Sequence, residues 1–141
     1  MSEHHTNCIL SPEQYNYLWR TSWFSLVGAF YAYYTGYYDF IIFPGGVFLT
    51  SINYWRKPDY SWRRYLDIAF AHYAMSHQFI KAYNCENARL HYLIMFFSAL
   101  CFPVGVYYYN KKNFWASTYI HSLIHIFGNV ANIVLYSGKK Y

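Results

Sequence analysis

The stretch "HYLIMFFSALCFPVGVYYY", residues 91–109, decides the fold class of this chain. It contains no Asp, Glu, Lys or Arg. A helix on the surface of a soluble bundle keeps a polar face, and this stretch offers none. A run of about 20 apolar residues is what a helix needs to cross the hydrocarbon core of a bilayer. The sequence therefore predicts an integral membrane protein, with the lipid bilayer as its first partner.

Composition and charge favour the same class. Only 12% of the 141 residues are charged, and 26% are aromatic. The charged share is about half of that in a typical soluble domain, and the 19 tyrosines suit membrane–water interfaces. The net charge of +5 comes largely from basic residues at the ends of apolar runs. This pattern indicates a membrane protein, so we expect no nucleic-acid partner; a homo-oligomer is left open.

Five apolar segments predict an all-α fold, a multipass transmembrane bundle of about five helices. The connections between them are short, so residues 12–138 are expected to form a single transmembrane domain, between a polar N-terminal tail at 1–11 and a short basic tail at 139–141. A capping box of Ser11 and Gln14, with Pro12 at the first helical position, opens the first helix. The segments are richest in apolar residues over 21–34, 40–55, 64–80, 91–109 and 113–136.

The second segment is the least regular of the five. Residues 40–55 would make a helix about 24 Å long, shorter than the hydrocarbon core of about 30 Å. Pro44, Gly45 and Gly46 weaken its first turns. We therefore expect this helix to be short, and a kinked or re-entrant path is left open.

The basic residues predict the orientation. If five segments alternate in direction, seven of the 11 Lys and Arg residues fall on the side of the N-terminus. Short cytoplasmic loops carry the excess of basic residues. The N-terminus is therefore expected in the cytoplasm and the C-terminus on the opposite side, provided that the second segment crosses.

A polar stripe runs along the last segment. Ser117, His121, His125, Asn129 and Asn132 are spaced by three or four residues, so they share one helical face. Polar groups at membrane depth are costly and usually face a bundle interior or a water-filled cavity. Two explanations stay open: hydrogen bonds that hold helices together, and a functional site.

Three histidines and one carboxylate are candidate metal ligands: His72, His121, His125 and Asp67. A pair of histidines four residues apart can place both imidazoles on one ion. In the third and fifth segments, which run in the same direction, His72 and His121 each lie about 12 Å from the segment start. Asp67 has an alternative role in a first helical turn, where it can pair with Arg63.

Asp67, His72 and the terminal H-x3-H of His121 and His125 partly resemble the alkaline ceramidase and adiponectin-receptor superfamily. The resemblance implies an intramembrane zinc site and hydrolysis of a lipid amide or ester. The chain departs from that family in having about five segments where the family has seven. Asp67 also precedes His72 on the same helix, and no Ser-x3-His precedes them.

Three functions follow from these patterns. The leading expectation is a non-enzymatic structural or accessory membrane component, because the residues offer no nucleophile, base and oxyanion set. The first alternative is the zinc-dependent hydrolase. The second is a haem protein with His72 and His121 as axial ligands. His91, beside Arg89 at a helix start, is expected at the membrane interface.

Overall fold

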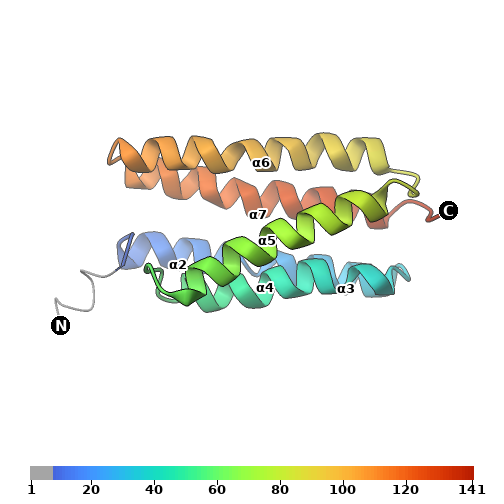
Figure 1. Ribbon diagram of the computed structural model, residues 1–141, viewed down its shortest axis with the longest axis horizontal. Coiled ribbons are helices and arrows are strands. Elements are labelled where there is room, and N and C mark those ends of the chain that lie inside the picture. The colour runs from blue at the N-terminus through green and yellow to red at the C-terminus, as the bar shows by residue number, and fades with distance from the viewer. Residues whose placement is uncertain (1–7) are drawn as a thin grey trace.

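The computed structural model describes residues 8–141 and shows an all-helical bundle (Figure 1). No strand occurs within these residues; Cys85 and Lys140 form an isolated bridge. The helices are α2 (Pro12–Thr21), α3 (Phe24–Tyr34), the 3-10 turn η1 (Tyr38–Phe40), α4 (Ile42–Trp55), α5 (Trp62–Ala82), α6 (Ala88–Asn110) and α7 (Phe114–Tyr136).

The first segment is one helical rod with a break between α2 and α3. The hydroxyls of Thr21 and Ser22 both donate to the carbonyl of Leu18, at 3.0 and 2.8 Å. Such bonds from Ser and Thr to the preceding turn often bend a helix. At its start, the Ser11 N–H donates to Gln14 Oε1 at 2.9 Å, as expected for the capping box. With α2 and α3 counted as one segment, the predicted five helical segments are confirmed.

The segments alternate in direction along one long axis, and the described chain begins and finishes at opposite ends of the bundle (Figure 1). One layer holds α6 and α7, and the other holds α2, α3 and α4. Helix α5 crosses diagonally from the second layer toward the first. It packs mainly against α4 and meets α6 near one end, where the Tyr92 hydroxyl donates to the Phe79 carbonyl at 2.7 Å.

Helix α4 is short, as predicted, but it is continuous. It has 14 residues, about 21 Å of helix, and η1 precedes it directly. Pro44 lies in the first turn, where its missing N–H costs no intrahelical hydrogen bond. With η1, the segment runs from one end of the bundle to the other (Figure 1).

Helices α6 and α7 are long and apolar enough to cross a membrane. Each has 23 residues, or about 34 Å of helix. Among the described residues these are the only two helices that meet this criterion, and 17% of the apolar window of α6 is buried. Its buried residues are small or polar, whereas most of its large apolar side chains are exposed: Leu90, Leu93, Phe96, Phe97, Leu100, Phe102, Val104, Val106 and Tyr107.

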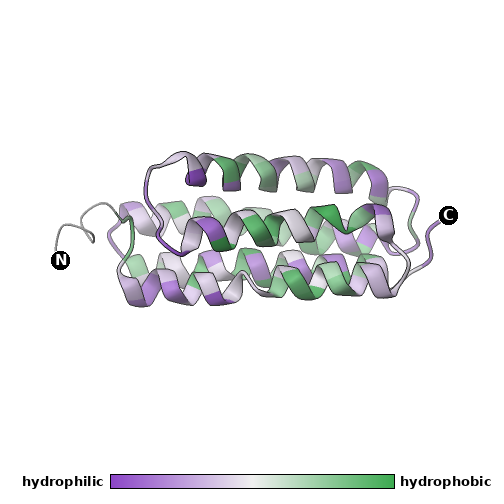
Figure 2. Ribbon diagram, turned by 90° about the horizontal axis from the view of Figure 1, so that it is seen from below, coloured by the Kyte–Doolittle hydropathy of each residue, from purple (hydrophilic) through white to green (hydrophobic). Residues whose placement is uncertain are grey.

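The two ends of the bundle are polar and closed by specific contacts. Loops and helix ends there are mostly hydrophilic in Figure 2. At the end near the N-terminus, Tyr109 donates to the Ile9 carbonyl at 3.1 Å, and Leu10 is buried. Ile9 and Leu10 of the predicted tail therefore pack against the bundle; residues 1–7 of that tail lie outside the described residues. At the other end, Lys81 and Lys140 pair with Asp39.

Candidate functional site

A chamber of about 340 Å³ lies in the middle of the bundle. We define it by its walls, which come from α3, α4, α5, α6 and α7. Most of the lining is apolar, with Met75, Met95, Phe102 and Ile124 among the larger side chains. The polar lining residues are Ser25, Ser51, Asp67, His72, Gln78, Ser98, His121, His125, Asn129 and Asn132.

Three members of the polar stripe hold helices together. The Ser117 hydroxyl donates to the Gly105 carbonyl of α6 at 2.8 Å. The Asn129 side chain donates to the Ser25 hydroxyl of α3 at 3.3 Å and to the carbonyl of His125 at 2.6 Å. Asn132 accepts a hydrogen bond from the side-chain amide of Gln78 on α5. These residues fit the role of interhelical hydrogen-bonding groups.

The side chains of the two histidines of the stripe, unlike those of its other three members, make no cross-helix hydrogen bond within the described residues. Their imidazole centroids lie 5.7 Å apart, and both rings line the chamber. His121 packs edge-on against Trp55, with centroids 4.9 Å apart. His125 is only 7% exposed, and its Nε2 has no hydrogen-bond partner within the described part of the chain. Interhelical hydrogen bonding therefore does not account for this pair.

Asp67 faces the same chamber from α5. Its Oδ1 lies 2.8 Å from the Ser51 hydroxyl and 3.0 Å from the Thr50 hydroxyl, both on α4. The expected pairing of Asp67 with Arg63 is wrong. Arg63 is buried and turns away to Asp59, at 3.1 Å, because the loop between α4 and α5 folds back over the helix start.

His72 lines the chamber from the side. It is exposed, and its Nδ1 lies 2.8 Å from the Ile68 carbonyl one turn earlier. Its position brings the chamber to the outer surface of the bundle beside α5. His77 is also exposed and packs against the Tyr73 ring, with centroids 4.4 Å apart. His77 does not appear among the lining residues.

The four predicted metal ligands thus share one chamber: Asp67, His72, His121 and His125. Within residues 8–141, however, no group of three or more His, Cys, Asp or Glu side chains is positioned to hold a metal ion. The zinc site stays a prediction. The haem alternative also stays a prediction, and the chamber is at the small end of the range for ligand pockets.

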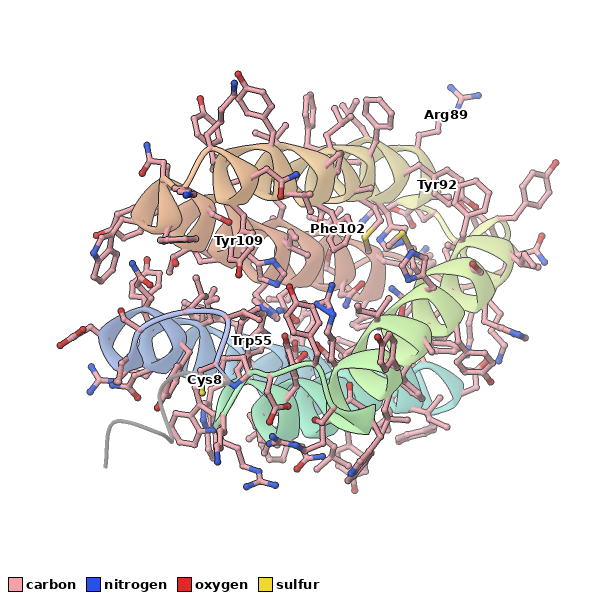
Figure 3. The ribbon with its side chains drawn as sticks, turned by 60° about the vertical axis from the view of Figure 1, so that its left-hand side comes forward. Cys8, Trp55, Arg89, Tyr92, Phe102 and Tyr109 are labelled. Carbon is pink, nitrogen blue, oxygen red and sulfur yellow. The ribbon has the colours of Figure 1, made fainter. Side chains whose placement is uncertain are left out.

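A second cavity of about 220 Å³, here called the neck, adjoins the chamber. The two share Asp67, Ile68, Phe102 and His121. The neck continues toward the end of the bundle near the N-terminus; the residues that line it there are Leu10, Tyr54, Tyr60, Arg64, Tyr109 and Asn110. Figure 3 shows Phe102 and Tyr109 reaching from α6 toward this space, with Trp55 on its other side.

The opposite end of the chamber is sealed. Gln78 links α5 to Asn132 and accepts a hydrogen bond from the Tyr136 hydroxyl at 2.6 Å. Behind Tyr136 lies a buried aromatic cluster that includes Tyr37 and Phe40. The side chains of Gln78, Asn132 and Tyr136 therefore close this end of the chamber.

Several residues of the site were not predicted from the sequence. Gln78, Thr50 and Ser51 stand inside apolar segments, and that placement was the available signal. Trp55, the last residue of α4, is buried against His121. His91 was expected at the interface; it is buried between α6 and α7, with Nδ1 2.8 Å from the Ala131 carbonyl.

Comparisons of the chain with protein-family models, curated proteins and solved structures find no match.

Proposed function

We propose that this chain is a multipass integral membrane protein of non-enzymatic, structural or accessory function, whose five helical segments enclose a ligand chamber. The single observation that carries the proposal is the distribution of side chains on α6, where small and polar residues are buried and large apolar residues are exposed. Its buried positions include Ser98, Gly105 and His91, while its large apolar side chains point outward. Membrane helices pack through small and polar residues in this way, because lipid already solvates their apolar side chains.

Extraction tests the membrane part of the proposal. Membranes that contain the expressed chain should retain it after an alkaline carbonate wash and release it into dodecyl maltoside. A chain that stays monodisperse in plain buffer without detergent would overturn the proposal, since the exposed face of α6 would then be stable in water. Such a face should aggregate without detergent, because soluble monomers rarely expose large contiguous apolar patches.

The proposed orientation places the N-terminus in the cytoplasm and the C-terminus on the other side. It is supported by the alternating segments and by the excess of Lys and Arg at the N-terminal end, where Arg56, Arg63 and Lys111 lie. Reporter fusions at the loop around Asn84 and at the C-terminus should report the far side, and a fusion at the loop around Asp59 the cytoplasm. If the fusions near Asp59 and Asn84 report the same side of the membrane, α5 does not cross it.

The non-enzymatic role is supported by the cross-helix bonds of Ser117, Asn129 and Asn132, which use most of the polar stripe for packing. The double variant His121→Asn, His125→Asn tests it. A folded chain without loss of bound metal is expected, because the cross-helix bonds of Ser117, Asn129 and Asn132 remain in this variant. Loss of stoichiometric metal in this variant would contradict it.

Zinc-dependent hydrolysis is the second candidate, favoured by one observation: Asp67, His72, His121 and His125 line a single chamber. Bound zinc would acidify a water molecule for attack on a lipid amide or ester. Elemental analysis of protein purified in detergent separates the two candidates. One zinc per chain would favour the hydrolase, and the leading proposal expects zinc well below that level.

A further inference from the structure

Three side chains of the chamber keep hydrogen-bonding capacity that the described residues do not use: Asp67, His121 and His125. Ser51 and Thr50 both approach Oδ1 of Asp67, so neither hydroxyl engages Oδ2. His125 Nε2 has no partner within residues 8–141, and the His121 ring makes ring contacts with Trp55 and His125. All three side chains line the same space.

The charge of Asp67 is also unpaired. The ion pairs of the described chain join Asp59 to Arg63 and Asp39 to two lysines, and none includes Asp67. The nearest arginine along α5, Arg64, lies over the Tyr60 ring, 5.0 Å from its centroid. A carboxylate at membrane depth without a cation is costly, and such groups pair with a charge or neutralise. No ion pair within residues 8–141 includes Asp67, so a cationic ligand can supply the missing charge.

The hydrogen-bond acceptors that the chamber offers decide which cation fits. A primary ammonium group has three N–H donors and no acceptor. A carboxylate at Asp67 and the imidazoles of His121 and His125, each of which has one acceptor nitrogen when it is neutral, can together offer acceptors to such a group. The χ2 torsion of histidine is roughly two-fold, so a ring flip of about 180° exchanges the edge that His125 turns toward the chamber. Hydrogen bonds to nitrogen are about 2.9 Å long, whereas zinc needs ligands at about 2.1 Å. An ammonium thus contacts its acceptors at a longer distance than a zinc ion does, and the three side chains line one chamber, with the two imidazole centroids 5.7 Å apart.

The remaining walls favour an apolar chain on that ammonium. Met75 and Met95 face the chamber from α5 and α6, and Phe102 lines both chamber and neck. Methionine and phenylalanine suit flexible hydrocarbon groups. The volume of about 340 Å³ corresponds to roughly ten water-sized groups, enough for a short alkyl chain. Exposed His72 marks where a longer chain would leave toward lipid between α5 and α6.

We propose that the chamber binds a primary-amine amphiphile, with its ammonium held by Asp67, His121 and His125 and its hydrocarbon chain along Met75, Met95 and Phe102. This inference rests on the proposed function, because it requires the helices to enclose a ligand chamber inside a membrane. The amine enters through the neck or from the lipid beside α5; the end sealed by Gln78 and Tyr136 stays closed.

Thermal unfolding of the detergent-purified chain tests the inference with four probes of equal chain length. These are n-octylamine, n-octanol, n-octanoate and octyltrimethylammonium. A ligand that binds the folded state raises the melting temperature in proportion to its affinity. Octylamine is expected to raise it, and the other three are expected to have less than about a tenth of its apparent affinity, since they lack the charge or the N–H donors.

Variants locate the site. Asp67→Asn should weaken octylamine binding about ten- to hundredfold, the range for a hydrogen bond to a charged group. The matched control is Asp39→Asn, a carboxylate at the far end of the bundle, which should bind octylamine as the original chain does. Circular dichroism of each variant without ligand establishes that it is folded.

A second variant keeps the test valid if Asp67→Asn does not fold. His125→Leu removes a buried nitrogen without a partner among the described residues, so it should unfold at the same or a higher temperature. It should nevertheless bind octylamine more weakly. A purely structural histidine would give the opposite result: lower stability and unchanged binding.

Equal stabilisation by octanol or octyltrimethylammonium, or full octylamine binding by Asp67→Asn, would overturn the inference while a ligand chamber remained. No shift with any probe would also overturn it. Extraction and orientation of the chain are read from other experiments, so either failure is distinguishable from a failure of the membrane proposal.

Discussion

Gln78 on α5 donates a hydrogen bond from its side-chain amide to Oδ1 of Asn132 on α7. The side-chain oxygen of Gln78, Oε1, in turn accepts a hydrogen bond from the Tyr136 hydroxyl at 2.6 Å. Gln78 and Asn132 are both buried, and Gln78 is only 2% exposed. This link joins α5, which otherwise packs mainly against α4, to the opposite layer, and it closes one end of the chamber.

Replacing Asn132 should therefore loosen α5. In Asn132→Leu the amide of Gln78 loses its acceptor and stays buried, which should lower the free energy of unfolding by about 1–2 kcal/mol. Thermal unfolding in dodecyl maltoside measures the change. Ser76→Ala, at an exposed position two residues earlier on α5, serves as the control and should have no measurable effect. Equal stability of Asn132→Leu and the original chain would show that the link contributes nothing.

The sequence predicted the stripe but not its partners, and the reason is physical. Helical periodicity is local, so the spacing of His121, His125, Asn129 and Asn132 was enough to place them on one face. The partner of Asn132 depends on the diagonal crossing of α5 between the layers, and no local pattern encodes that angle. For this reason Gln78 was missed although it stands in an apolar segment.

The burial of His91 has the same explanation. Its place beside Arg89 at a helix start favoured an interfacial position. The ring is nevertheless 1% exposed, because α6 and α7 pack closely along their whole length and the Ala131 carbonyl is within hydrogen-bond reach. Long-range packing of two helices thus overrides a local signal at a helix end.

A close approach of three helices at Gly28 gives the second prediction. A Cβ at Gly28 would lie 3.0 Å from Oδ1 of Asn129 and 3.3 Å from Cβ of Pro44. The proline ring is rigid and Asn129 is hydrogen-bonded, so neither can yield easily. Gly28→Ala should cost about 1–2 kcal/mol of unfolding free energy through overpacking.

Gly45 supplies the matched control for this substitution. It also lies in an apolar helix, but a Cβ there would only contact Ala29 at 3.8 Å, an ordinary van der Waals distance. Gly45→Ala should be neutral or stabilising, by up to about 1 kcal/mol, because alanine favours the helix. Thermal unfolding of both variants measures the difference, and equal melting temperatures would refute the close approach at Gly28.

Arg63 carries the third prediction, at the start of α5. Its guanidinium donates to the carbonyls of Asn53 and Lys57, at 3.0 and 2.8 Å, and to Asp59 at 3.1 Å. It thereby satisfies backbone carbonyls at the end of α4, which helix termini leave without partners. Arg63→Ala should lower the unfolding free energy by about 1.5–3 kcal/mol, the range for hydrogen bonds to charged groups.

The control for Arg63 is Arg56, an exposed arginine whose Nε donates to Asn53 Oδ1 at 3.1 Å on the same helix. Arg56→Ala should change stability by less than about 0.5 kcal/mol. Limited proteolysis of the loop between α4 and α5 gives an independent readout, since Arg63→Ala should expose it. A resistant loop in that variant would contradict the proposed role.

The acidic limb of the pH–stability curve carries the last prediction. Partial burial pushes the pKa of the Asp39 carboxyl upward, but hydrogen bonds from Lys140 and Lys81 outweigh it and hold that pKa below its ordinary value of 3.8. A carboxyl whose pKa is lower in the folded state stabilises the fold above its unfolded pKa. That contribution is lost as the pH falls through the folded pKa.

Asp39→Asn should consequently lower stability at pH 6 by about 0.2–1 kcal/mol, because the ion pairs at 2.9 and 3.2 Å are half-exposed. The deficit should shrink between about pH 4 and pH 2 and fall with added salt, since salt screens exposed charges. Glu13→Gln, an exposed carboxylate at the other end of the bundle, controls for the general loss of a negative charge. A deficit for Asp39→Asn that stays constant from about pH 6 to pH 2 would mean that the substitution disturbs packing and that the two lysines do not stabilise the fold through charge.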